Sequence, residues 1–130
     1  MIMITGGSFQ GKIKFAAEHF NINKNDILSG ENCRFDNVFS AKCVSNFQYL
    51  IKRLIENKID PVEFTQKLCR DNPKAVIIIN EIGCGIIPIE KSERIWREQT
   101  GRAGCIVAEK ASAVIRICCG IPTIIKGEIK

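Results

Sequence analysis

The residues between positions 6 and 12 have the types and spacing of a phosphate-binding loop. They follow the pattern G-x-x-x-x-G-K, and they lie between a predicted strand and a predicted helix. Glycines allow backbone N–H groups to face phosphate oxygens, and the start of the next helix adds partial positive charge. We therefore predict a nucleotide site in which Lys12 reaches the β- and γ-phosphates and in which the binding residues are Gly6, Gly7, Ser8, Gln10, Gly11 and Lys12.

The residue that follows Lys12 departs from this pattern. A serine or threonine at this position would ligate Mg²⁺, but the chain has Ile13. The nearest hydroxyls, Thr5 and Ser8, do not stand at the expected position. Phosphate binding is compatible with the change, whereas the positioning of a metal is weakened. The alternative is a glycine-rich turn between strand and helix that binds no ligand.

A second candidate segment, Asn80–Pro88, follows the strand with the strongest apolar pattern. In a parallel sheet, ligands bind beyond the carboxyl ends of the strands. Glu81 is therefore a candidate catalytic residue and a candidate ligand of Mg²⁺ or its waters. Gly83 and Gly85 permit a close backbone approach or a positive φ. The alternative is an ordinary loop in which Glu81 is solvated.

The remaining groups with reactive or charged side chains are less specific. Arg94, Arg97 and Arg102 suit phosphate or carboxylate groups, but they equally suit surface ion pairs with Glu90, Glu93 and Glu98. The one histidine, His19, has no partner at a catalytic spacing, which favours packing or exposure over catalysis.

The cysteine spacing favours packing over metal binding. The seven cysteines include no C-x-x-C pair, and their odd number favours reduced thiols. Most of them lie in apolar segments, where cysteine behaves as a small hydrophobic residue. Core packing is therefore expected rather than a zinc site, and Cys84, between two glycines, is the thiol to test for reactivity.

Strands and helices alternate along the chain, which predicts an α/β fold with a mainly parallel sheet in one domain over residues 1–130. Asp60, Pro61 and Glu63 have the types of a helix start. Strands are predicted over 1–5, 27–30, 75–79 and 113–118, with an edge strand over 122–126. Helices are predicted over 12–20, 38–57, 61–70, 92–98, with a Ser92 cap, and 101–110.

Composition narrows the class of protein. Hydrophobic residues make up 45% and charged residues 25% of the 130-residue chain, which is typical of a globular domain rather than a disordered one. The net charge of +5 suits an anionic ligand, but the basic residues are scattered, so no nucleic-acid partner is expected. No apolar run is long enough to span a membrane, and the first residues lack the pattern of a signal peptide. A cytoplasmic protein is expected.

Taken together, these segments resemble the adenosylcobinamide kinase / adenosylcobinamide-phosphate guanylyltransferase family of cobalamin biosynthesis. The motif Asn80-Glu81-Ile82-Gly83-x-Gly85-Ile86-Ile87-Pro88 resembles the family's N-E-V-G-x-G-I-V-P, and Arg97 with Gly101-Arg102 resembles its F-R-x-x-x-G-R. Ile115–Lys126 resembles its final strand and turn. Ile4–Lys12, with Ala17-Glu18, is similar to its opening. The resemblance covers about the first 20 and the last 55 residues.

The resemblance implies a P-loop (RecA-like) three-layer domain, assembled as a trimer, that uses ATP or GTP with Mg²⁺. Family members phosphorylate the aminopropanol hydroxyl of adenosylcobinamide and then transfer GMP through a guanylyl-histidine. Carried over to this chain, Gly6, Gly11 and Lys12 match the nucleotide loop. Glu81 matches the acidic strand end, and Arg102 matches the G-R motif.

Two departures bear on activity. The chain is shorter than the family by roughly 50 residues in its middle, which normally carries the guanylylated histidine, and no histidine follows Ile27. Guanylyl transfer is therefore expected to be lost. Three functions remain open. One is a cobinamide kinase-type enzyme in which Lys12 and Glu81 are catalytic. Another is a non-catalytic partner or regulatory subunit that binds a nucleotide or a corrinoid. The third is a structural subunit with no ligand.

Overall fold

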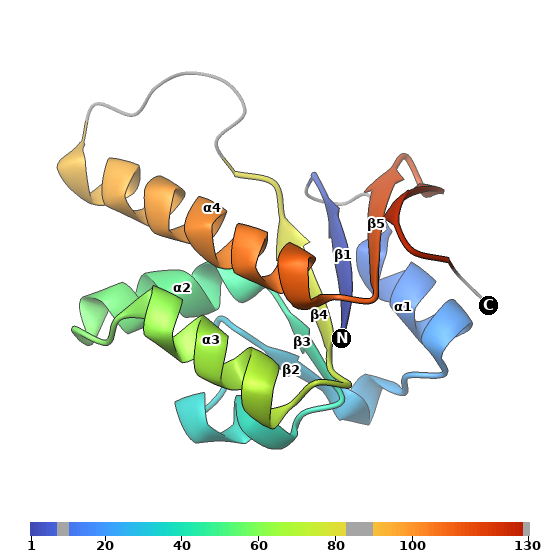
Figure 1. Cartoon of the computed structure of the whole chain (residues 1–130), viewed down its shortest axis with the longest axis horizontal. Coiled ribbons are helices and arrows are strands. Elements are labelled where there is room, and N and C mark those ends of the chain that lie inside the picture. The colour runs from blue at the N-terminus through green and yellow to red at the C-terminus, as the bar shows by residue number, and fades with distance from the viewer. Residues whose placement is uncertain (8–10, 83–89, 129–130) are drawn as a thin grey trace.

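The computed structural model describes residues 1–7, 11–82 and 90–128. Strands and helices alternate through most of the chain (Figure 1). The strands are β1 (Ile2–Gly6), β2 (Ile27–Ser29), β3 (Cys43–Ser45), β4 (Val76–Asn80), β5 (Ala113–Cys118) and β6 (Ile121–Lys126). The α-helices are α1 (Lys12–Phe20), α2 (Phe47–Glu56), α3 (Pro61–Asp71) and α4 (Lys91–Lys110), and the 3₁₀ segments are Lys24–Asp26 and Phe35–Ser40.

One six-stranded sheet runs through the molecule in the order β2-β3-β4-β1-β5-β6. Neighbouring strands pair in parallel from β2 to β5, and only β6 pairs antiparallel, with β5. The strand that leads into the candidate phosphate loop, β1, is central and lies between β4 and β5. The expected mainly parallel α/β architecture is confirmed.

Helices cover both faces of this sheet, which makes the fold three-layered. Ile4, Ile78 and Ile115 on one face pack with Phe15 and Ala16 of α1. Side chains of the other face pack under α2, α3 and α4, and these include Met3, Val44, Ile77, Ile79 and Val114. Because β4 is buried on both faces, its sequence is a continuous β-branched run rather than an alternating one.

The middle of the chain differs from the predicted helix over 38–57. Phe35–Ser40 is a 3₁₀ segment, Cys43–Ser45 is the strand β3, and the helix α2 begins only at Phe47. The residue between strand and helix, Asn46, has a left-handed backbone with φ of 52°. The apolar positions of this segment also fit a helical period, which led to the wrong prediction. The three residues of β3 are instead buried in the sheet, where they pair with β2 and β4.

One long helix, α4, takes the place of the two helices that were predicted over 92–98 and 101–110. The helix α4 continues through Gly101, and its N-cap is Glu90, so Ser92 lies inside the helix and does not cap it. Burial of Thr100, Ala103 and Val107 along one face compensates for the low helix propensity of glycine. None of the helices in the described ranges combines the length and the apolar character that a bilayer crossing requires.

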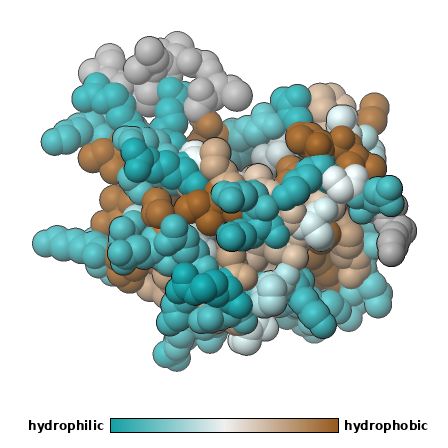
Figure 2. Space-filling model, in the orientation of Figure 1, coloured by the Kyte–Doolittle hydropathy of each residue, from teal (hydrophilic) through white to brown (hydrophobic). Residues whose placement is uncertain are grey.

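The helix start at residue 60 is confirmed, since the Asp60 carboxylate accepts a hydrogen bond from the Val62 N–H and Pro61 occupies the first turn. The predicted edge strand is also present as β6, and all its residues are exposed. Figure 2 shows apolar side chains gathered over the hairpin of β5 and β6, where Ile121, Ile124 and Ile125 are exposed.

The described cysteines divide equally between core and surface. Cys33, Cys43 and Cys69 are buried, as core packing predicts, and burial raises the pKa of Cys43 to about 12. Core packing was expected for most cysteines, but Cys105, Cys118 and Cys119 are exposed. Cys84 lies outside the described residues.

Two glycine substitutions are expected to change stability in opposite directions. A Cβ at Gly6 would lie 2.3 Å from the Ile117 carbonyl oxygen, and φ there is +147°, so Gly6→Ala should destabilise the fold by about 2 kcal/mol or more. A Cβ at Gly101 meets nothing within 4 Å, so Gly101→Ala should stabilise by roughly 0.5–1 kcal/mol through helix propensity. Denaturant unfolding of both variants and of wild type gives the changes in the free energy of unfolding. Changes of the same sign and size in the two variants would contradict the prediction.

Candidate functional site

The turn after β1 is held at the edge of the sheet by close contact with β5. Gly6 approaches the Ile117 carbonyl so closely that no side chain fits between the two strands. Gly11, at the other end of the turn, is the N-cap of α1 and has φ of +90°. Both predicted glycines therefore have backbone conformations that L-residues rarely adopt. Ser8 and Gln10 lie outside the described residues.

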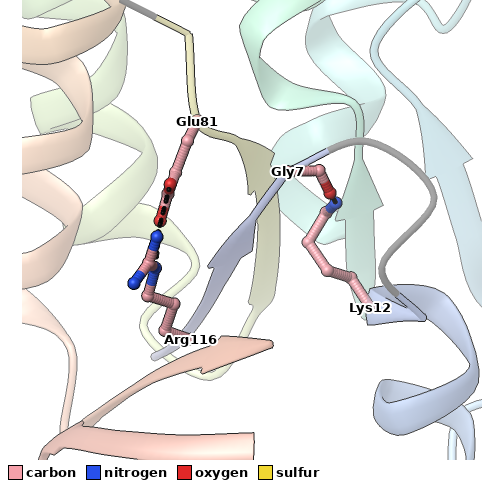
Figure 3. Close-up of polar contacts among 4 residues, drawn as sticks. All are labelled: Gly7, Lys12, Glu81 and Arg116. Carbon is pink, nitrogen blue, oxygen red and sulfur yellow. Dashed lines mark hydrogen bonds and ion pairs between the residues drawn. The ribbon is translucent and has the colours of Figure 1, made fainter. Parts of the chain in front are cut away.

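Lys12 is the buried charge of this turn. Its side chain comes from the first position of α1, is 6% exposed, and donates a hydrogen bond from Nζ to the Gly7 carbonyl at 2.5 Å (Figure 3). Burial lowers the pKa of Lys12, and the nearby Glu81 carboxylate opposes that shift. An ammonium can donate three hydrogen bonds, and the described residues provide one acceptor for Lys12, the Gly7 carbonyl; a phosphate-binding lysine uses such donor capacity toward its ligand.

A cavity of about 450 Å³ opens beside Lys12. It lies at the carboxyl ends of β3 and β4, where ligands bind in parallel sheets. Its volume is in the range of small-molecule sites. The lining residues are Gly11, Lys12, Ile13, Lys14, Glu31, Ser45, Asn46, Tyr49, Ile78 and Asn80.

A hydrogen-bonded set of polar groups adjoins this cavity, and two of its members, Asn46 and Asn80, line it. The Gln48 amide oxygen accepts from the backbone N–H of Asn80 at 3.0 Å, and its Nε2 donates to Asn46 Oδ1 at 3.4 Å. Asn46 Nδ2 in turn donates to the Ser29 hydroxyl at 3.4 Å. Gln48 is 1% exposed, so these contacts link the ends of β2, β3 and β4.

The sequence pattern does not mark these residues. Asn46 and Gln48 lie inside the helix that was predicted over 38–57. In such a helix, polar residues between the apolar positions are expected to face solvent. The available signal was the pair Ser45-Asn46 directly after the apolar pair Cys43-Val44. Tyr49 lines the cavity from α2, and Glu31 lines it from the loop after β2. Arg53 holds that loop by donating to the Gly30 and Cys33 carbonyls.

Glu81 lies at the predicted strand end, but its carboxylate is engaged. Its backbone N–H extends the β1–β4 ladder by donating to the Gly6 carbonyl at 2.8 Å. Its two carboxylate oxygens accept from Nε and Nη2 of Arg116 on β5, at 2.7 and 3.2 Å, as Figure 3 shows. The pair therefore bridges β4 and β5, the two neighbours of β1, and Arg116 was not anticipated.

The described residues do not form a resident Mg²⁺ site at Glu81. No group of three or more acidic, histidine or cysteine side chains within 1–7, 11–82 and 90–128 is placed to hold a metal ion. Both Glu81 oxygens already accept from Arg116, and Ile13 lines the cavity with an apolar side chain. The donor set in this part of the chain is that of an ion pair rather than a metal centre.

The remaining candidates lie elsewhere. Arg102 pairs with Glu98 along α4 at 2.8 Å, both side chains are more than half exposed, and Arg102 is outside the lining of the Lys12 cavity. Arg102 therefore forms the surface ion pair that was predicted as the alternative to a phosphate contact. His19 is exposed and stacks on Phe15 with ring centroids 4.0 Å apart, again outside the cavity lining.

Comparison with known protein families identifies the chain. The model of the family described as cobinamide kinase / cobinamide phosphate guanyltransferase matches residues 37–125, more than half of the 130 residues. The chain belongs to this family. Family membership supports a role in cobalamin biosynthesis, and the P-loop fold of the family agrees with the three-layer architecture. None of the curated proteins compared with the chain matches it.

The matched range corrects the extent of the resemblance. It includes the C-terminal motifs, as expected, and it also includes residues 37–75, which the resemblance had left out. The phosphate loop at residues 6–12 lies before the matched range. Its assignment therefore depends on the geometry of Gly6, Gly11 and Lys12 rather than on the family match.

The Glu81 carboxylate is expected to set the protonation of Lys12. Because Glu81 opposes the effect of burial, Glu81→Gln should lower the pKa of Lys12 further below its ordinary value of 10.5. Arg116→Gln is a control that breaks the same ion pair but retains the Glu81 carboxylate. Titration of the lysine side-chain carbons by NMR gives both values. An unchanged Lys12 pKa in Glu81→Gln would show that the two groups do not interact.

Proposed function

We propose that the protein binds ATP or GTP, with the triphosphate on the turn between β1 and α1, and that it acts as a cobinamide kinase-type phosphotransferase of cobalamin biosynthesis. The observation that carries the proposal is the burial of Lys12 beside the cavity of about 450 Å³. A buried ammonium is costly in the free protein and gains most from an anionic ligand. Family membership supplies the substrate class.

The proposal divides the cavity between the two reactants. Lys12 and the backbone at the start of α1 neutralise charge on the transferred phosphoryl group. The polar lining residues Ser45, Asn46 and Asn80 then lie where an acceptor hydroxyl would approach. Mg²⁺ would enter with the nucleotide and would supply charge neutralisation, since the described side chains do not hold it themselves. A corrinoid as acceptor and a trimeric assembly remain predictions from the resemblance.

We further propose that guanylyl transfer through a histidine is lost. The chain has one histidine, and its contacts are with Phe15 on α1 rather than with the cavity. Transfer of GMP to a histidine requires the ring nitrogen to face the α-phosphate. His19 packs its ring against its own helix, and its Nδ1 lies 3.2 Å from the Phe15 carbonyl oxygen.

The second candidate function is a non-catalytic subunit that binds a nucleotide or a corrinoid. The specific observation in its favour is the Glu81–Arg116 pair, because a carboxylate with both oxygens engaged is a poor catalytic group or metal ligand. The two functions share the nucleotide site and differ in turnover. Assay of adenosylcobinamide phosphorylation separates them once binding has been measured.

Calorimetric titration of ATP and GTP into wild type, Lys12→Ala and Lys74→Ala tests the nucleotide site. Loss of the charged donor should weaken binding by roughly 10- to 100-fold in Lys12→Ala. Lys74→Ala removes the same charge from an exposed position before β4, at the amino end of the sheet, and should bind like wild type. Equal affinity of all three proteins would contradict the assignment of Lys12.

The lowered pKa of Lys12 gives the same site a pH signature. A polyphosphate favours the ammonium form, so binding should take up protons as the pH approaches the pKa of Lys12 in the free protein. Affinity should therefore fall with rising pH at values below 10.5, the ordinary pKa of lysine. Titrations in buffers of different ionisation enthalpy measure the proton uptake. Uptake that persists in Lys12→Ala would assign it to another group.

A further inference from the structure

The turn between β5 and β6 has a cysteine at a position that cysteine rarely occupies. Cys118, the last residue of β5, pairs with Ile121, the first of β6, so the hairpin loop consists of Cys119 and Gly120. Both loop residues have positive φ, 53° and 78°. This is the pattern of a type I′ turn, whose first position favours asparagine, aspartate or glycine. A cysteine there carries a conformational cost that the hairpin alone does not require.

The left-handed backbone places two neighbouring cysteine side chains on the same side of the chain. In a regular strand φ is about −120° to −140°, and successive side chains point to opposite faces. Relative to a strand residue, the φ of 53° at Cys119 rotates its Cβ about the N–Cα bond by roughly half a turn. Cys118 retains strand geometry, so its side chain and that of Cys119 project together from the end of β5.

Exposure separates this pair from the cysteines of the core. Cys118 and Cys119 are both exposed. The buried cysteines of the described ranges are Cys33, Cys43 and Cys69. A thiol must lose its proton to act as a metal ligand. Burial raises the pKa of Cys43 to about 12 and also raises the pKa of Cys69, so these two thiols resist that loss.

Two thiols from adjacent residues suit a soft metal ion better than a disulfide. Consecutive Cα atoms lie about 3.8 Å apart across a trans peptide, below the range of roughly 4.4–6.8 Å for disulfides, so a bond between these sulfurs would be strained. Structural zinc requires four ligands, and in residues 1–7, 11–82 and 90–128 no three histidine, cysteine or carboxylate side chains form a metal-binding group. Cu(I) is the soft ion that two thiolates satisfy.

The cysteine pair lies beside the turn that leads into α1. A Cβ at Gly11, the N-cap of α1, would lie 3.7 Å from the Cα of Gly120. A metal on the pair would therefore adjoin the proposed phosphate site. Two neutral thiols that lose two protons and gain one Cu⁺ carry one net negative charge. That charge disfavours a polyphosphate on the neighbouring turn.

We propose that Cys118 and Cys119 form a two-thiolate site for a soft monovalent metal ion of the Cu(I) class, and that its occupancy weakens polyphosphate binding between β1 and α1. In the binding step two Cu–S bonds form, both thiol protons leave to solvent, and no electron is transferred. The metal site follows from the geometry of the hairpin. Its coupling to phosphate rests on the proposed nucleotide function.

Competition with a chromogenic Cu(I) chelator under anaerobic conditions measures the site. Wild type should bind Cu(I), and Cys118→Ser should weaken binding by roughly 100-fold or more, because one of the two ligands is lost. Cys105→Ser is the matched control, since it removes an exposed thiol from α4 and should bind like wild type. Equal Cu(I) affinity of wild type and Cys118→Ser would overturn the site.

Cys119→Asn tests the second ligand in a variant that retains the fold. Asparagine adopts the left-handed conformation more readily than cysteine, so the thermal midpoint should equal or exceed that of wild type. Cu(I) affinity should nevertheless fall by roughly 100-fold or more. Retained affinity in Cys119→Asn would show that its sulfur is not a ligand, and the two-thiolate site would be overturned.

Calorimetric titration of inorganic tripolyphosphate, with and without Cu(I), tests the coupling. Affinity of wild type should fall several-fold when the metal site is filled, and the difference should shrink at high ionic strength, because the effect is electrostatic. In Cys119→Asn the same amount of Cu(I) should leave tripolyphosphate affinity unchanged. An equal loss in wild type and Cys119→Asn would assign the effect to Cu(I) bound elsewhere and would overturn the coupling.

The outcomes distinguish this inference from the function on which its coupling rests. Cu(I) binding that requires both cysteines, together with a tripolyphosphate affinity that Cu(I) does not change, would support the metal site and overturn the coupling. If wild type binds neither nucleotides nor tripolyphosphate, the proposed function and the coupling are both overturned. The chelator competition decides the metal site in either case.

Discussion

The central constraint in this fold is the close approach of β1 to β5 at Gly6. The Ile117 carbonyl occupies the space where any side chain at this position would project, so the strand ends in a residue without one. Because the pairing of Gly6 with Asn80 and Ile117 is fixed by two parallel ladders, the turn toward α1 begins at the carboxyl edge of the sheet. The burial of Lys12, the hydrogen bond from Glu81 to Gly6 and the cavity beside Lys12 depend on that starting point.

The charged side chains near the end of β1 lie on two sides of this strand. Lys12 comes from the layer of α1 and is buried against the Gly7 carbonyl, whereas Glu81 and Arg116 pair across β1 on the side of α4. The Glu81–Arg116 pair is partly exposed, so its contribution to stability is about 1 kcal/mol at most. Its larger effect is electrostatic, since the Glu81 carboxylate supports the charged form of Lys12 in an environment that disfavours it.

The sequence predicted most of what local pattern controls. The strand β4 is an unbroken β-branched run, the helix α3 begins at an Asp-Pro pair, and the turn before Lys12 is marked by glycines, so each was assigned correctly. The errors occurred where tertiary burial overrides the local pattern. The three residues of β3 do not make a period-2 signal, and Gly101 interrupts the pattern of α4 without ending the helix.

The sequence by itself determined the family, the α/β architecture and the residue types of the candidate phosphate loop, because these depend on residue types at fixed spacing. Only the tertiary structure decided which groups meet. It joined Glu81 to Arg116, which are 35 residues apart, and it linked Ser29, Asn46 and Gln48 by hydrogen bonds between side chains. Such contacts depend on strand order, and strand order is set by the burial of two sheet faces rather than by any one segment.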